Sequence, residues 1–537
     1  MEAAKPRDAM TKRIFIVASA VISLAFVVWQ CVWAVATPSF RGPDEIQHFN
    51  SILRVATTGD WPDPGGATID SQVVIAIHEA GFMAGDPDFF AIANKSPLRG
   101  GMGEFAGYAT PYQFATITPH LDRTVIDYGT TEPTNLTDQM TQHPPLYYMV
   151  VGGVIKTLGA LDWTWDRQLL LARIVSILMT APIVPALIFT ARRVGLSRRT
   201  SLVTGVLAFI VPQLVFVTSV VTNDALAIGA GALTIAACAA GMFGKGSWRA
   251  VICAGLALGL GLWSKGTFLP FGLVVGLAFV LNRQAGSARM RWLKGISAGL
   301  IGVVTGGFWW IRNLVTFGTL QPSGLSRHSV EEGTDFVKFL RQAFRLFVDS
   351  SWGEFGWLEW WLRAPVIAVL AGVTALLLII SLAKGPDLLK KLNLLGFYFL
   401  VGIVLLVQAW SAFQETGYTQ GIQGRYLFPG IVGMLVVAAL PWARAMDRRG
   451  SSWPLLIAPA ISVLVGGYAL ADWLLACYFS ENSVIFLDWT RWSLATGFEI
   501  SSLHMVIMVA GLSLAIAALT PAVASFHANR HSRVLDA

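Results

Sequence analysis

The stretch "HPPLYYMVVGGVIKTLGALDWTWDRQLLLARIVSILMTAPIVPALIFTARRVGLSRR", residues 143–199, decides how the chain is arranged. It holds two apolar runs, 145–161 and 168–191, and it ends on four arginines. The first run has about 17 residues, contains Lys156 and begins with prolines, whereas a membrane span needs about 20 apolar residues. Length therefore leaves open whether residues 145–161 cross a membrane or lie as a helix on its surface.

The distribution of positive charge resolves this choice. If 145–161 stays outside, 168–191 runs inward onto the arginines, and the later turns alternate consistently. The inner segments then hold 22 of the 39 Lys and Arg but only five of the 32 acids, and these segments are 1–13, 192–199, 244–249, 283–295, 384–392, 442–453 and 522–537. Cytoplasmic loops are enriched in Lys and Arg, so we predict an outer interfacial helix at 145–161.

Composition indicates an all-α polytopic membrane protein. The 537 residues are 54% hydrophobic and 13% charged, against roughly one quarter charged in soluble domains. The net charge of +7 lies in short loops without any nucleic-acid-binding motif, so we expect no nucleic-acid partner. We predict a multi-pass protein of the cytoplasmic (plasma) membrane with both termini cytoplasmic and about twelve spans, at 14–36, 168–191, 200–221, 225–243, 250–264, 267–282, 296–314, 364–383, 393–412, 426–441, 454–476 and 501–521.

This topology places nearly every unusual polar group on the outer face, around the two large outer loops 37–167 and 315–363. Ionisable residues at membrane depth are costly unless paired or hydrated, so we first interpret them as functional. Structural alternatives exist for some of them: snorkelling for Lys265, helix capping for Asp224, anchoring of a span for Arg425, and an interfacial aromatic belt for Trp352 and its neighbours.

Cations and an acid at a water–lipid boundary suit a lipid phosphate whose head group is reached from outside. Arg and Lys would bind the phosphate. The acid would either accept the proton of an attacking hydroxyl or hold a divalent metal that steadies the leaving phosphate. One base suffices for an inverting transfer, because a lipid phosphate leaves without needing protonation.

Seven motifs in order resemble a known family: "RGPDEIQHF", "QHPPLYYMVVGGVIKTLG" followed by "RQLLLARIVSIL", "TNDAL", "LWSKGTFLPF", "WWIRNLVTFGT", "SSWGEFGWL" and "QGRYLFPG". They resemble a bacterial predicted-membrane-protein family related to the dolichyl-phosphate-mannose mannosyltransferases of the GT-C glycosyltransferase superfamily. The resemblance implies a GT-C-like catalytic region over 1–445, with the outer loops 37–167 and 315–363, followed by C-terminal transmembrane helices over 446–537. It also implies a polyprenyl-phosphate-linked sugar as donor.

The resemblance assigns roles by position. Asp44 matches the catalytic acid, and Glu45 is its near alternative. The candidates for binding the donor phosphate are His143, Arg173, Lys265, Arg312 and Arg425. We expect contacts with the acceptor or the sugar from His48, Asp224, Trp352, Glu354 and Gln423.

The predicted activity is a membrane glycosyltransferase that moves a sugar to a cell-envelope glycan or lipid acceptor on the extracytoplasmic face. Metal-dependent members carry a second acid in a D-x-D pattern, whereas Asp44 and Glu45 are adjacent, so we expect no metal site and no cofactor, with a divalent metal as the open alternative. The rival hypothesis is a transporter or flippase of a lipid-linked saccharide. The sequence does not indicate an oligomeric state.

Overall fold

The computed structural model describes residues 10–82, 116–130, 134–322, 333–358, 360–449, 454–480 and 485–535. Its α-helices are α1 (Lys12–Ala36), α2 (Glu45–Thr57), α3 (Ser71–Glu79), α5 (Leu146–Thr157), α6 (Trp165–Thr180), α7 (Ile183–Arg193), α8 (Arg198–Val206), α9 (Pro212–Thr218), α10 (Asp224–Phe243), α11 (Trp248–Leu262), α12 (Phe271–Val280), α13 (Ala288–Gly306), α14 (Phe308–Phe317), α15 (Phe336–Trp352), α16 (Ala364–Ala383), α17 (Leu388–Leu394), α18 (Gly396–Thr416), α19 (Ile431–Arg449), α20 (Pro454–Tyr478), α21 (Trp489–Thr496) and α22 (Ile500–Leu535).

Short 3-10 helices connect them, at η3 (His120–Asp122), η4 (Gln139–Gln142), η5 (Ala160–Asp162), η6 (Leu207–Ile210), η7 (Gly266–Phe268), η8 (Arg283–Ala285) and η9 (Gly424–Gly430). Two short antiparallel strands, β1 (Glu354–Phe355) and β2 (Trp360–Trp361), make up the only sheet among the described residues. The predicted all-helical class is confirmed.

Eight helical segments are long and apolar enough to cross a membrane, or ten if each of two bent pairs is one span, within the described parts of the chain. One bend, of 73°, falls where Pro212 interrupts the helix, because proline lacks the N–H that an inner turn requires. The predicted spans at 250–264 and 267–282 coincide with apolar helices of fewer than 18 residues. The count of twelve therefore stays a prediction.

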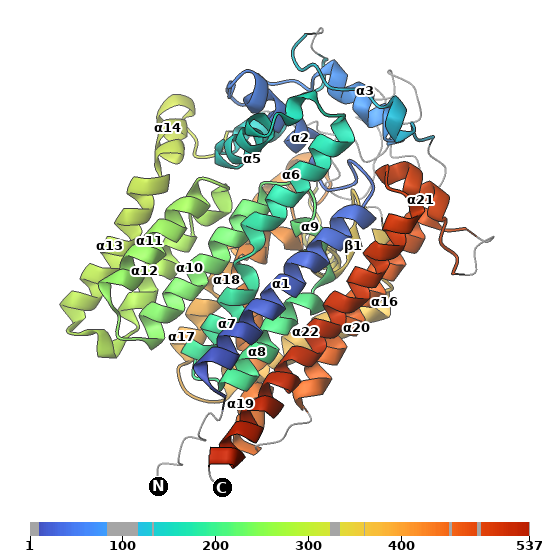
Figure 1. The fold of residues 1–537 in the computed structure, drawn as a ribbon. Helices are drawn as coiled ribbons and strands as arrows, with labels where there is room; N and C mark the ends of the chain where they lie inside the picture. Colours follow the sequence, from blue (N-terminus) through green and yellow to red (C-terminus); the bar gives the residue numbers. More distant parts are fainter. Residues whose placement is uncertain are drawn as a thin grey trace.

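Helices α2, α3 and α5 gather above one end of the long helices, and we call this the loop end (Figure 1). α5 has 12 residues and extends about 18 Å at about 1.5 Å per residue, which is too short to cross a bilayer core of about 30 Å. It packs on α2 and α6. These dimensions support the sequence prediction that this run is not a span.

The opposite end of the molecule carries the start of α1 and the end of α22, which run side by side (Figure 1). This arrangement agrees with termini on one side of a membrane, although which side they occupy stays a prediction. Trp492 of α21 donates an indole hydrogen bond to the carbonyl of Val35 at 3.1 Å, so the C-terminal helices are fastened to α1. The division of the chain at residue 445 stays a prediction.

Helix α10 lies inside the bundle because its sequence, "DALAIGAGALTIAACAAGMF", consists largely of small residues. Small residues let helix backbones approach closely in membranes. A Cβ added at Gly231 would lie 2.2 Å from the carbonyl oxygen of Pro429, so only glycine lets η9 rest on α10. Because η9 lies close to α10, Arg425 of η9 is near Asp224 at the start of α10.

Candidate functional site

A chain of four charged side chains lies at the loop end. The Arg425 guanidinium donates to the Asp44 carboxylate at 2.7 Å and lies 3.6 Å from Asp224. Asp224 in turn accepts a hydrogen bond from the Lys265 ammonium at 2.6 Å. Four of the predicted site residues, which come from four distant parts of the sequence, therefore converge, and their charges cancel.

Asp44 stands out within this chain because it is the most exposed member, with 24% of its side chain accessible against 4% for Arg425 and 2% for Asp224. It occupies the N-cap position of α2 in the left-handed conformation, with φ of 56°. An N-cap aspartate usually accepts hydrogen bonds from the first turn of its helix. Asp44 makes no such bond and directs its carboxylate to Arg425 instead.

Glu45 has a different environment from Asp44. It is fully buried, and its carboxylate accepts hydrogen bonds from Arg173 at 2.8 and 2.7 Å and from the backbone N–H groups of Gly42 and Val221. These bonds join the loop before α2 to α6 and to the turn before α10. The carboxylate of Glu45 is thus enclosed by protein, whereas that of Asp44 reaches solvent.

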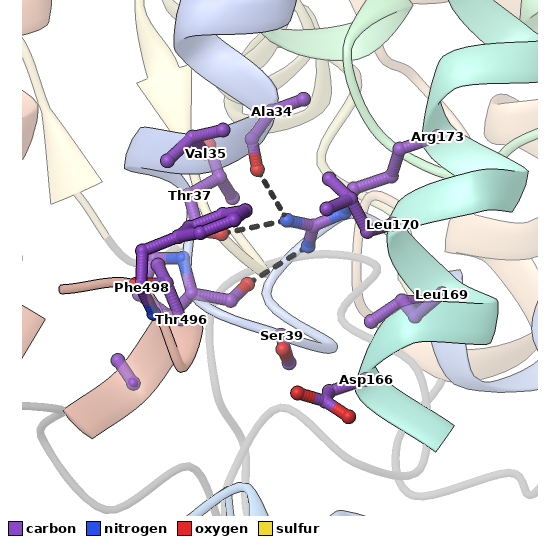
Figure 2. A pocket seen from close by; sticks show the side chains of 12 residues that line it. Ala34, Val35, Thr37, Ser39, Asp166, Leu169, Leu170, Arg173, Thr496 and Phe498 are labelled. Atoms are coloured by element: carbon purple, nitrogen blue, oxygen red, sulfur yellow. Dashed lines mark hydrogen bonds between the residues drawn. The ribbon is translucent and has the colours of Figure 1, made fainter. Parts of the chain in front are cut away.

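Arg173 has every guanidinium donor engaged within the protein. Besides Glu45, it donates to the carbonyl oxygens of Ala34, Thr37 and Pro38 at 2.7–2.9 Å, and Figure 2 shows these three bonds. The small pocket drawn there lies beside Arg173 between the end of α1, α6 and Phe498. None of the four residues of the charged chain lines that pocket.

Two buried histidines border the charged chain. His48 contacts the Tyr148 hydroxyl at 2.9 Å and the Thr222 hydroxyl at 3.3 Å. Burial lowers the pKa of His48 well below its usual value and lowers the pKa of His143 to about 3. Both imidazoles are therefore neutral at pH 7, and His143 Nδ1 is buried without a hydrogen-bond partner. His143 would meet a phosphate as a neutral donor rather than as a cation.

The segment around Arg425 completes this region. Gln423 accepts a hydrogen bond from Arg425 Nε at 2.5 Å, which orients the guanidinium. The Tyr426 ring lies 4.4 Å from the Lys265 ammonium and 5.1 Å from the Arg425 guanidinium carbon. Tyr426 and Tyr148 were not predicted as site residues, because an aromatic residue beside a span is usually part of the interfacial belt.

Three predicted site residues make their contacts away from the charged chain. Arg312 pairs with Asp63 at 2.5 Å and lies over the ring of Trp309. Trp352 is buried in the main apolar core, and Glu354 accepts a hydrogen bond from the Trp361 indole at 2.7 Å. No hydrogen bond or ion pair described in the structure joins these three residues to Asp44.

Two structural alternatives from the sequence are also settled. Asp224 is the first residue of α10 rather than its cap, which is Asn223, so the capping interpretation is wrong. Lys265 does not extend away as a snorkelling side chain, since its ammonium pairs with buried Asp224. Groups of three or more His, Cys, Asp or Glu side chains suited to a metal are absent from the described residues, and metal dependence stays untested.

A family model and several solved structures match this chain, whereas a search of the curated proteins found no match. Among solved structures, ArnT from Cupriavidus metallidurans matches in the apo state, with a TM-score of 0.44, 13% identity and coverage of 94% of this chain and 76% of ArnT. ArnT bound to undecaprenyl phosphate matches with a TM-score of 0.44, 14% identity and coverage of 96% and 78%.

An oligosaccharyltransferase from Archaeoglobus fulgidus, tethered with an acceptor peptide, matches with a TM-score of 0.42, 11% identity and coverage of 90% of this chain and 55% of that chain. A family model for a predicted membrane protein matches residues 26–434, which is more than half of the sequence and includes every candidate site residue. The chain therefore belongs to the predicted membrane protein family DUF2142.

Proposed function

We propose that this protein is a membrane glycosyltransferase that uses a polyprenyl-phosphate-linked sugar. The observation that carries the proposal is the charged chain of Asp44, Arg425, Asp224 and Lys265 at one end of the spans. Buried ion pairs add little net stability compared with apolar packing, so their presence favours a role in binding or chemistry. A partly exposed acid paired with Arg425, with Lys265 one ion pair further along the chain, suits transfer from a lipid phosphate.

In this proposal Arg425 and Lys265 bind the donor phosphate. Arg425 already has one edge toward Asp44 and the other toward Asp224, and Tyr426 lies against both cations. A phosphate that binds Arg425 competes with Asp44 for the guanidinium. Donor binding would therefore release the Asp44 carboxylate at the moment when a base is needed.

Asp44 is the proposed general base. Its carboxylate would accept the proton of the acceptor hydroxyl while that oxygen attacks the sugar carbon and the carbon–phosphate-oxygen bond breaks. The phosphate departs as an anion stabilised by the cations, so no second acid is needed. A single displacement of this kind inverts the configuration at the sugar carbon.

Glu45 and Arg173 receive a supporting role instead of the catalytic and phosphate-binding roles expected from the resemblance. The enclosed carboxylate of Glu45 and the five engaged donors of Arg173 support this assignment. Together they hold the Gly42–Glu45 loop against α6. We propose that this pair orients the backbone from which Asp44 reaches Arg425.

Transfer by purified protein from a panel of polyprenyl-phosphate sugars tests the proposal. Asp44→Asn keeps the shape of the side chain but cannot accept the proton, and removal of a general base typically lowers the rate about 10²–10⁴-fold. Asp127→Asn is the matched control, because Asp127 is an exposed aspartate on the same outer loop. Full transfer activity of the Asp44→Asn protein would contradict the assignment of Asp44 as base. The transporter alternative would be favoured if the protein moved the lipid-linked saccharide across the vesicle membrane without transferring its sugar.

The proposed setting follows from the charge pattern. We propose that the loop end faces outside the plasma membrane, that both termini are cytoplasmic, and that the acceptor is a cell-envelope glycan or lipid. A C-terminal reporter that is active only in the cytoplasm tests the orientation. Such a reporter should be active at the C-terminus, and an inactive reporter on a correctly inserted protein would contradict the orientation.

A further inference from the structure

Helix α15 carries three distinct faces along its 17 residues. One face packs against the protein through Phe339 and Ala343, which are almost fully buried against Phe413 of α18. At about 100° per residue, the exposed apolar side chains occupy the adjacent arc. They are Phe336, Val337, Leu340 and Phe344, and 70% of Phe344 is accessible.

The third face of α15 is basic. Lys338, Arg341 and Arg345 are all exposed and lie on the far side of the apolar arc from the buried face. Among the described residues, the acids near this edge are Asp335, whose carboxylate caps the helix at the N–H of Lys338, and Asp349, which lies 3.5 Å from Arg345. Within this described part of the chain, the three cations outnumber the two acids.

The position of α15 places these faces at the boundary between spans and loops. Phe336 and Phe339 lie 5.0 and 5.1 Å from the ring of Trp410, near the end of α18. The other end of the helix reaches the segment that carries the site, because the Ser350 hydroxyl accepts a hydrogen bond from the N–H of Gly424 at 2.7 Å. α15 thus lies at the same end of the molecule as Arg425 and Asp44.

We propose that α15 is an interfacial helix that binds anionic phospholipids of the surrounding bilayer. The apolar arc enters the acyl-chain boundary, and Lys338, Arg341 and Arg345 contact head-group phosphates. An amphipathic helix with aromatic residues on one face and basic residues on the polar face has the composition for this position. The partner is a lipid surface and not a second copy of this chain, because the exposed apolar arc borders a row of like charges that two copies would bring together.

Lipid capture by the full chain in nanodiscs tests this proposal independently of any transfer activity. The nanodiscs contain phosphatidylcholine with a minor fraction of phosphatidylglycerol, and native mass spectrometry measures the phosphatidylglycerol retained by the released protein. Each basic residue near an anionic surface changes binding roughly five-fold. We expect Arg341→Gln/Arg345→Gln to reduce retention by roughly thirty-fold for the two charges.

Arg341→Lys/Arg345→Lys is the matched control, because it keeps both charges at the same positions and should retain the lipid. Thermal unfolding in discs of phosphatidylcholine alone should be the same for both variants, which shows that folding is intact. Unchanged phosphatidylglycerol retention in the glutamine variant would overturn the proposal. It would also be overturned if Val337→Ser/Phe344→Ser converted a dimer into a monomer without altering lipid retention, since the apolar arc would then be a contact between copies.

Discussion

The buried pair of Arg173 and Glu45 offers the sharpest test of how this site is built. Arg173→Met keeps most of the side-chain volume but removes the charge. The variant loses two charge-assisted hydrogen bonds to Glu45 and leaves the carbonyl oxygens of Ala34, Thr37 and Pro38 without their donor.

The expected cost follows from burial. Glu45 is completely inaccessible, so its charge would remain in the protein without a compensating cation. Removing one partner of a buried ion pair typically lowers the free energy of unfolding by about 3–5 kcal/mol. Arg312→Met is the control, because the pair of Arg312 with Asp63 is partly exposed and such pairs contribute about 0–1 kcal/mol.

Unfolding in mixed micelles, followed by circular dichroism, measures both variants. The double variant Arg173→Met/Glu45→Gln should be more stable than Arg173→Met, because it removes the uncompensated charge as well. The reasoning is refuted if Arg173→Met costs less than about 1 kcal/mol. It is also refuted if the double variant is less stable than the single one.

Three further predictions concern the charged chain and its histidines. Lys265→Met should lower the free energy of unfolding, because it leaves buried Asp224 with only Arg425, at 3.6 Å. The double variant Lys265→Met/Asp224→Asn should recover the free energy of unfolding, but its KM for the donor should stay raised. Arg425→Lys replaces a bidentate fork by a point charge that cannot grip a phosphate at two oxygens, so transfer assays should show a raised KM for the donor. An unchanged KM would count against phosphate binding at Arg425. Burial lowers the pKa of His143 to about 3 in the folded chain. As the pH falls below about 6.5, the unfolded chain therefore binds a proton at this residue that the folded chain does not bind. The stability that this group contributes is present above about pH 6.5 and is lost as the pH falls toward 3. His143→Gln should therefore flatten the dependence of the thermal unfolding temperature on pH in that window. An unchanged dependence would contradict burial as the cause.

Much of the architecture was predictable because it depends on local composition. Apolar runs such as 14–36 and 364–383 form helices of membrane length, since each residue contributes its transfer free energy independently of distant partners. The interfacial prediction for 145–161 relied on charge counting and agrees with a helix of 12 residues. The bend at Pro212 was missed, although the proline itself was a visible signal.

The site was only partly predictable, because adjacent residues received opposite environments. Asp44 and Glu45 looked interchangeable in the motif "RGPDEIQHF", yet one reaches solvent and the other is enclosed. The left-handed backbone at Asp44 separates their directions. No pattern of residue types encodes that conformation, since aspartate adopts it only in particular turns.

The sequence by itself determined that this is a helical membrane protein, that runs such as 14–36 and 364–383 are long enough to span, and at which end the acids and the isolated cations lie. These features follow from hydropathy and charge, which act residue by residue. Only the tertiary structure decided which charges meet. Arg425 pairs with Asp44, which is 381 residues away in the sequence, and Arg173 pairs with Glu45, which is 128 residues away. The Coulomb energy of such a pair depends on the distance between the charges and on their burial, and helix packing sets both.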